Sequence, residues 1–243
     1  MVHVLQNSLP YDVSAPRPLP GIQPLRMQDW LIFDEAFAGQ MAERDRLLRV
    51  ARDDVLAMDS GAREAAGELL DLVLELKYPG AGVQVTRGDG VCVAIDRNDP
   101  LGTLGQLVQE DLCILQKVGD QHVLTGAVLC FPASWTLSQK FMAPLTGIHA
   151  PVADYDAGIA ARVQRMFDGV KPDRPLWRFN ALWYSDPMLY QPRKADDPRD
   201  EMAAQTADYL RSERQCILRL PRTGAVVFSI HTYVVPRTAM AQT

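Results

Sequence analysis

The sequence is poor in residues that form covalent links or metal sites. It has four cysteines in 243 residues, and none of them stands in a C-x-x-C pair. Cys92, Cys113, Cys130 and Cys216 all lie in apolar or strand-like settings. We therefore expect buried, reduced thiols in a cytoplasmic protein, and neither a disulfide framework nor a cysteine zinc site.

Long hydrophobic runs and an excess of positive charge are also absent. No stretch of eighteen apolar residues occurs, so we expect no segment that spans a membrane. The first 25 residues lack a basic segment followed by an apolar one, so we expect no export signal. The formal net charge of −5 argues against non-specific binding of nucleic acid.

The motifs that mark the most common enzyme classes are missing as well. There is no G-x-x-x-x-G-K-[ST], no G-x-G-x-x-G after a predicted strand, no G-x-S-x-G and no H-E-x-x-H. The composition, with 47% hydrophobic and 23% charged residues, nevertheless provides a substantial core. A chain of 243 residues with this composition suits one large domain.

The spacing of apolar residues predicts helices in the first third of the chain. Residues 1–26 are rich in proline, and we expect an extended arm that lies on the domain surface. Apolar residues at helical spacing predict one helix over about 27–52 and a second that includes 65–76. Ser60 is the expected N-cap of the second helix, and Tyr78-Pro79-Gly80 ends it.

Short alternating segments predict antiparallel strands in the rest of the chain. Residues 82–96 form a predicted hairpin around Gly88-Asp89-Gly90, and residues 107–132 form a second one around Gly119-Asp120. The sequence also predicts helices over 157–167 and 201–210, a strand over 176–185, and a last hairpin over 211–236 that turns at 222–224. Helices followed by hairpins predict an α+β domain with a mostly antiparallel sheet.

Four histidines are the candidates for any histidine-dependent chemistry. His3 lies in the arm and is nearly excluded, and His122 follows a hairpin turn, where we expect it to face solvent. His231 alternates with Ser229 and Tyr233 on one face of the last predicted strand. That face is either solvated or lines a pocket in which these side chains bind a small molecule.

The fourth histidine, His149, lies in the segment "WTLSQKFMAPLTGIHAPV". Pro144 and Pro151 restrict the backbone on both sides of it, and Leu145, Ile148 and Val152 make its surroundings apolar. These features suit a histidine that binds a flat hydrophobic cofactor such as haem. An ordinary buried loop histidine without a metal is the alternative.

Several unusual stretches occur together along the chain. They are "VQEDLCILQK", "CFPASWTLSQK" continuing into "PLTGIHAPV", and "LRSERQCILRLPRTGAVVFSIHTYVVP", with a looser match in "RFNALWYS". In these stretches the chain resembles the haem-dependent oxidative N-demethylases, from about residue 27 to residue 236. The patterns W-x-L-x-x-K…P-L-x-x-I-H-x-P-V and E-R-Q…L-P-x-[ST]-G-A…F-x-I-x-T-Y are long and unusual, which makes the resemblance specific.

The resemblance implies a haem-binding, PAS-like fold, with residues 1–26 as a proline-rich arm and residues 27–243 as a single domain. In the family's characterised enzyme, haem b activates dioxygen to remove a methyl group from a small secondary amine. Electrons come from NADPH through separate subunits that carry FMN and a [2Fe–2S] cluster. The implied partners are therefore an amine, dioxygen and a reductase, because the chain has no flavin or nicotinamide motif of its own.

The resemblance also implies which residues hold the haem. His149 is the expected iron ligand, with its second ring nitrogen bound to a carbonyl or carboxylate. His231, His122 and the Cys130 thiolate are alternative ligands. For the propionates we favour Lys140 and Arg214 among the basic residues of the matched stretches, which also include Arg178 and Arg222. Surface positions are the alternative for these cations.

The substrate amine needs an acceptor, since a small amine is mostly protonated at neutral pH. Glu213 is the expected carboxylate, because alternation places it with Arg211 and Gln215 on one face of a strand. A salt bridge between Glu213 and a neighbouring arginine is the alternative. Tyr233 and His231 are expected to polarise bound oxygen. These assignments depend on strand register, since a slip of one residue inverts the two faces.

Two residues depart from the pattern that we expect of the family. Met142 stands where we expect glycine, and His231 stands where members often carry arginine in F-x-I-R-T-Y. These departures favour a different substrate, or a haem-free ligand-binding protein. Because most haem-binding PAS domains are sensors, a sensor is a further alternative. Sensors usually carry a fused output domain, for which no room remains before Thr243, so we expect an enzyme subunit.

Overall fold

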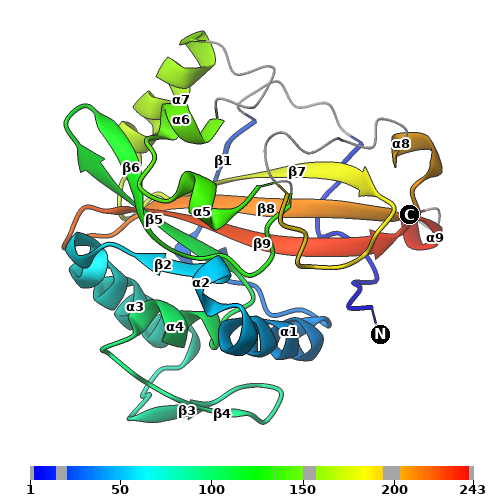
Figure 1. Cartoon of the computed structure of the whole chain (residues 1–243), viewed down its shortest axis with the longest axis horizontal. Helices are drawn as coiled ribbons and strands as arrows, with labels where there is room; N and C mark the ends of the chain where they lie inside the picture. Colours follow the sequence, from blue (N-terminus) through cyan, green and yellow to red (C-terminus); the bar gives the residue numbers. More distant parts are fainter. Residues whose placement is uncertain (1–2, 15–20, 134, 150–156, 194–202, 241–243) are drawn as a thin grey trace.

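The computed structural model describes residues 3–14, 21–133, 135–149, 157–193 and 203–240. A seven-stranded sheet with the order β1-β7-β8-β9-β5-β6-β2 forms its centre, and β3 and β4 form a separate hairpin (Figure 1). Every pair of strands in the described residues is antiparallel. The predicted α+β class with a large antiparallel sheet is therefore confirmed.

The strands are β1 (Gln23–Pro24), β2 (Leu56–Met58), β3 (Gln84–Thr86), β4 (Cys92–Ala94), β5 (Asp111–Val118), β6 (Gln121–Val128), β7 (Leu176–Tyr184), β8 (Tyr209–Arg219) and β9 (Val226–Pro236). The helices are α1 (Phe37–Val50), α2 (Arg52–Val55), α3 (Arg63–Lys77), α4 (Pro100–Gly105), α5 (Leu137–Lys140), α6 (Leu145–His149), α7 (Ala157–Gly169), α8 (Ala203–Thr206) and α9 (Arg237–Met240). Two 3-10 turns, η1 (Met27–Asp29) and η2 (Ser60–Ala62), precede α1 and α3. No helix among the described residues is both long and apolar enough to cross a membrane.

The sheet is covered by helices on both faces (Figure 1). Apolar residues of α1, α3 and α4 form one core with β5, β8 and β9, including Leu70, Leu104 and Leu218. A second core lies on the other face, where Leu137 of α5, Leu145 of α6 and Phe167 of α7 share a core with Ile217 of β8. Each central strand therefore buries both of its faces, and alternation decides which helical layer a side chain meets.

The three predicted hairpin turns are confirmed, but two predictions for the helical region are wrong. The predicted helix over 27–52 is interrupted after η1, because side chains of Gln109 and Glu110 accept hydrogen bonds from the backbone of Asp34 and Ile32 at 3.1 and 2.8 Å. This bonding keeps residues 30–36 out of a helix. Ser60 is not an N-cap, since Asp59 accepts a hydrogen bond from Gly61 N and starts a 3-10 turn that contains Ser60.

The last predicted helix is also shorter than expected. Among the described residues of 201–210, only Ala203–Thr206 are helical, and Tyr209 already belongs to β8. Tyr209 lies opposite Pro236, and Tyr184 lies opposite Tyr209. Pairing with strands on both sides satisfies the backbone at the start of β8, and a helix does not compete with it there.

The described residues of the predicted arm lie against the sheet. Gln6 donates its backbone N–H to Val234 O and accepts from Val234 N, at 2.9 and 2.8 Å. The ring of Tyr11 stacks on Phe179 with 4.4 Å between centroids. Figure 1 shows the described part of this segment passing behind the strands, and β1 pairs with β7. These contacts bring the N-terminal segment to the same face as α1.

The turn between α5 and α6 contains a methionine in the left-handed region, with Met142 at a φ of 59°. Its N–H donates to Leu124 O, and Leu124 N donates to Ala143 O, so β6 holds the turn in place. Met142 is half exposed and makes little use of its side chain for packing. This is the position at which the sequence comparison above expects glycine.

We predict that Met142→Gly raises the free energy of unfolding by about 0.5–1 kcal/mol. Glycine avoids the cost of placing a Cβ in the left-handed region, and its greater freedom in the unfolded chain offsets part of that gain. Urea unfolding followed by tryptophan fluorescence measures the change. The opposite substitution at a similar φ, Gly119→Ala, is the control and should destabilise the protein. A loss of stability in Met142→Gly would contradict the prediction.

Candidate functional site

Strand β8 directs its candidate residues to two different faces of the sheet. Glu213 lies opposite Asn180 on β7 and Thr232 on β9. Its neighbour Arg214 lies opposite His231. Because Ile217 packs in the core beneath α5–α7, alternation places Glu213 on that same face and Arg214 and His231 on the other. The structure therefore does not bring Glu213 together with His231 and Tyr233.

Glu213 is held by two neighbouring amides on the face toward α5–α7. Asn180 Nδ2 and Gln215 Nε2 both donate to the same carboxylate oxygen, Oε2, at 3.0 Å. Asn180 Oδ1 also accepts from the backbone N–H of Glu213 at 3.1 Å. Among the described residues no donor reaches the second oxygen, Oε1. Glu213 is thus a fixed carboxylate with one oxygen left for a ligand, and it forms no salt bridge within the described part of the chain.

Two further polar groups flank this carboxylate and have no hydrogen-bond partner among the described residues. Arg178 lies opposite Gln215, and its buried Nε makes no hydrogen bond. Thr232 lies opposite Glu213, and its buried Oγ1 is also unpaired. Burial lowers the pKa of Arg178, and the charge of Glu213 partly opposes this effect. Buried polar atoms without partners are costly, so the position of these two beside the Glu213 carboxylate suits a ligand. We call Arg178, Asn180, Glu213, Gln215 and Thr232 the Glu213 cluster.

An apolar wall lies on the same face of the sheet. Trp135, Phe141 and Ile148, from the segments around α5 and α6, pack against the core that contains Phe228 and Ile230 of β9. This face thus changes along the strands from apolar side chains to the polar Glu213 cluster. A ligand with a large apolar surface and a few polar groups fits such a face.

The predicted iron ligand is the last residue of α6. The backbone of His149 belongs to α6, which packs beside β6 and α7. Its side chain lies outside the described residues, as do Pro151 and Val152. Lys140, at the end of α5, donates from Nζ to the carbonyl of Ile148, directly before His149. Burial lowers the pKa of this ammonium group.

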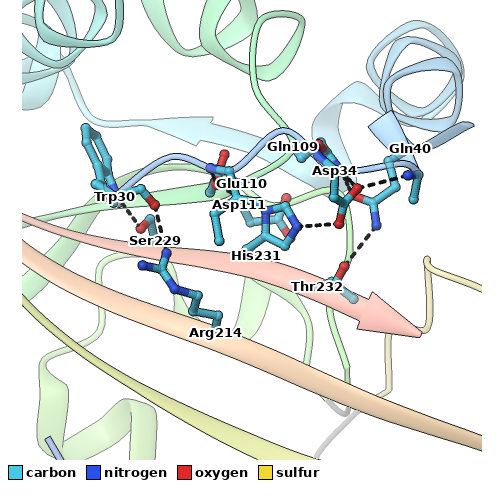
Figure 2. Close-up of polar contacts among 12 residues, drawn as sticks. Trp30, Asp34, Gln40, Gln109, Glu110, Asp111, Arg214, Ser229, His231 and Thr232 are labelled. Carbon is cyan, nitrogen blue, oxygen red and sulfur yellow. Dashed lines mark hydrogen bonds and ion pairs between the residues drawn. The ribbon is translucent and has the colours of Figure 1, made fainter. Parts of the chain in front are cut away.

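His231 is the centre of a buried polar network on the opposite face (Figure 2). Its Nε2 lies 3.1 Å from Asp34, and its Nδ1 lies 3.1 Å from Glu110. Burial lowers the pKa of His231, but hydrogen bonds with the two carboxylates outweigh it and raise the pKa to about 9. The imidazole is therefore protonated at neutral pH. The alternative of a solvated face is wrong, because α1, the segment before it and the N-terminal arm cover these side chains.

Tyr233 lies beside His231, with 4.6 Å between ring centroids. Burial raises the pKa of Tyr233, and its buried hydroxyl has no hydrogen-bond partner among the described residues.

The prediction that His122 faces solvent is wrong. Packing of α7 over β6 buries it beside Phe167, Gln164 Nε2 lies 2.9 Å from its Nδ1, and burial lowers its pKa.

The remaining two cationic candidates lie away from the Glu213 cluster. Arg214 donates to the carbonyls of Trp30 and Asp29, each at 2.8 Å, and lines an open depression of about 570 Å³ on the arm side of the sheet. Arg222 lies in the turn between β8 and β9, where it pairs with Asp71 of α3 at 3.3 Å. Of the four cations, Lys140 and Arg178 are thus the two on the face toward α5–α7.

The cysteines are free thiols, as predicted. Cys113, Cys130 and Cys216 are buried, and burial raises the pKa of each. Cys92 is exposed, contrary to the prediction, because it points to the outer side of the β3–β4 hairpin. Within the described ranges, no group of three or more His, Cys, Asp and Glu side chains is arranged to hold a metal ion.

Sequence reasoning missed Asn180 and Thr232 as members of the site. Both lie in segments that match the expected pattern, but only the pairing of β7, β8 and β9 brings them beside Glu213.

A protein-family model described as haem-dependent oxidative N-demethylase, alpha subunit-like, matches residues 21–243 of the chain. The match covers all the strands and helices described above.

Proposed function

Because the chain belongs to the haem-dependent oxidative N-demethylase, alpha subunit-like family, we propose that it binds haem b and removes a methyl group from a small secondary amine. The observation that carries this proposal is the Glu213 cluster beside an apolar wall. Within the described residues it combines, on one face of the sheet, a fixed carboxylate, a guanidinium whose buried Nε is unpaired, and an unpaired hydroxyl.

The residues on this face fit a haem group. Trp135, Phe141 and Ile148 provide apolar surface for the macrocycle. The guanidinium of Arg178, whose buried Nε has no partner among the described residues, suits a propionate, since a partly buried carboxylate needs a cationic donor. We propose His149 as the iron ligand, which the apolar end of α6 would present. Arg214 and Arg222 are already bonded elsewhere, so Arg178 is the preferred propionate partner.

The proposed reaction is the conversion of an N-methyl amine, dioxygen, two electrons and two protons into the demethylated amine, formaldehyde and water. Haem, when bound, supplies the iron that activates dioxygen. Glu213 Oε1 accepts a hydrogen bond from the ammonium form of the substrate and takes its proton, because oxidation requires the neutral amine. Asn180 and Gln215 hold the other oxygen, so the carboxylate stays oriented while the proton moves.

His231 and Tyr233 take no direct part in this proposal. They lie on the opposite face of the sheet, and His231 is bonded to Asp34 and Glu110 on both ring nitrogens. Thr232, whose Oγ1 has no partner among the described residues, lies beside Glu213 and takes the place of the predicted pair on the substrate side.

We also propose that residues 27–243 form one PAS-like domain. The five long strands have the order β6-β5-β9-β8-β7, which is second, first, fifth, fourth and third along the chain. This order is the one found in PAS domains, and α5–α7 lie between β6 and β7 along the chain.

The electrons are proposed to come from NADPH through a partner reductase that carries FMN and a [2Fe–2S] cluster.

Reconstitution with haem tests the function. The purified chain should take up haem and develop a Soret band, and His149→Ala should weaken haem binding at least tenfold and shift the band. His3→Ala, at an exposed position, is the matched control and should bind haem as the unmodified protein does. An unchanged haem content and spectrum in His149→Ala would remove this residue from the role.

Formaldehyde release separates an enzyme from a sensor. The haem-loaded chain should release formaldehyde from N-methyl amines when NADPH and a reductase are supplied, and release none with NADPH alone. Haem binding without formaldehyde from any amine would favour a haem-binding sensor. A chain that takes up no haem would end the oxygenase proposal.

A further inference from the structure

The carboxyl end of α6 is held by a lysine that is almost completely buried. Lys140 is 8% exposed, and its Nζ donates to the carbonyl of Ile148. This carbonyl belongs to the peptide bond that joins Ile148 to His149. The contact therefore acts directly on the backbone that carries the proposed iron ligand.

The chain reverses between α5 and α6 in a way that produces this contact. Met142 adopts a φ of 59°, and the backbones of Met142 and Ala143 are bonded to Leu124 on β6. Pro144 forms a bridge with Val123, and Thr146 Oγ1 donates to Gln121 at 2.9 Å. The start and the side of α6 are thus attached to β6, while Lys140 holds its other end.

A lysine is well suited to this position. A helix leaves its last carbonyl groups without partners inside the helix, and their negative partial charge attracts a cation. α6 is a helix of 5 residues, so a large share of its backbone lies at its ends. Within the described residues Lys140 has no carboxylate partner, and the Ile148 carbonyl is the one acceptor that compensates for its burial.

We propose that Lys140 is a positioning residue, which holds the end of α6 so that His149 meets the haem iron in a set orientation. In this role Lys140 does not bind a haem propionate. The inference rests on the proposed function, because it assumes that His149 binds haem iron.

Three ligands distinguish positioning from propionate binding. Haem has both iron and carboxylates, its dimethyl ester has iron but no charged carboxylates, and protoporphyrin IX has carboxylates but no iron. Dissociation constants are measured for each ligand with the unmodified protein and with Lys140→Met, which keeps the length of the side chain but removes the ammonium group. Lys117→Met, at a half-exposed lysine of β5, is the matched control.

Positioning predicts that Lys140→Met weakens the binding of haem and of its dimethyl ester by a similar factor of about 10–100. Binding of iron-free protoporphyrin IX should be unchanged, since no iron is there for His149 to meet. Lys117→Met should bind all three ligands as the unmodified protein does. The Soret band of haem bound to Lys140→Met should also shift, because the ligand field at the iron changes.

Two results would overturn the inference. Weaker binding of haem and protoporphyrin IX with unchanged binding of the dimethyl ester would assign Lys140 to a propionate. Unchanged binding of all three would leave it no role at the iron. If Lys140→Met does not fold, Lys140→Gln keeps a donor without the charge and is tested with the same ligands. Failure of the unmodified chain to bind haem would instead overturn the proposed function.

Discussion

Replacing Glu213 with glutamine should lower kcat/KM for formaldehyde release by about 100- to 10,000-fold. Glutamine keeps the size of the side chain but cannot take a proton from the ammonium group. The amides of Asn180 and Gln215, which donate to Oε2, remain as neighbours that favour the charged carboxylate. Turnover of the haem-loaded protein with a reductase, NADPH and N-methyl amines provides the measurement.

Haem content and the free energy of unfolding separate a chemical role from a structural one. Both should stay close to those of the unmodified protein in Glu213→Gln, since the amide group can still bond with Asn180 and Gln215. Glu75→Gln, at an exposed position on α3, is the matched control and should not change turnover. If Glu213→Gln demethylates at the unmodified rate, Glu213 has no part in the proton chemistry.

Replacing His231 with alanine should lower the free energy of unfolding by about 3–5 kcal/mol, because it leaves two carboxylates facing each other without their cation. Asp34 and Glu110 both lie 3.1 Å from the imidazole, which is fully buried. Asp34 also accepts from Gln6 and Gln109, so the loss extends to the N-terminal segment. Urea unfolding at neutral pH measures the difference.

The same network makes stability depend on pH in a defined direction. The pKa of His231 is raised to about 9 in the folded protein, above its value of about 6.5 in an unfolded chain. The contribution of protonated His231 to the free energy of unfolding is therefore complete below pH ~6.5 and is lost as the pH rises through about 9. Burial raises the pKa of Asp34, but its bonds with His231 and two glutamines lower it to about 2, so its own contribution is lost as the pH falls toward that value.

His231→Ala should lack the decrease of stability in the alkaline window, whereas His3→Ala, at an exposed position, should retain it. Stability that stays constant from neutral pH to pH ~9 in the unmodified protein would contradict a protonated His231. If the alkaline decrease of stability also disappeared in His3→Ala, the decrease would not come from the buried network.

The local pattern of residues was sufficient to predict the hairpins and the alternation on β8. Glycine and aspartate at 88–90, 119–120 and around 224 predicted the three turns that the structure contains. Alternation placed Glu213 with Gln215, and His231 with Tyr233, on common faces. These properties depend on neighbours along the chain, so the sequence alone determines them.

The relation between strands could not be read from one strand at a time. The pairing of Glu213 with Thr232, and of Arg214 with His231, puts the two predicted halves of the site on opposite faces. Shifting the register by one residue would have put them together. Register is set by the turn at 222–224 and by burial of two cores at once, which is a property of the folded sheet.

Burial and partners of the polar residues were likewise decided by the tertiary structure. In the sequence, His122 and His231 both follow patterns typical of an exposed strand face. In the fold, α7 covers one, and the segment before α1 brings Asp34 to the other. Local patterns along the chain determined the hairpins and most candidate residues, whereas contacts with distant segments decided where the helices over 27–52 and 201–210 end. The packing of distant segments decided which candidate residues share a face of the sheet and which have a hydrogen-bond partner. Strand pairing and helix packing join positions far apart along the chain, so no local pattern contains this information.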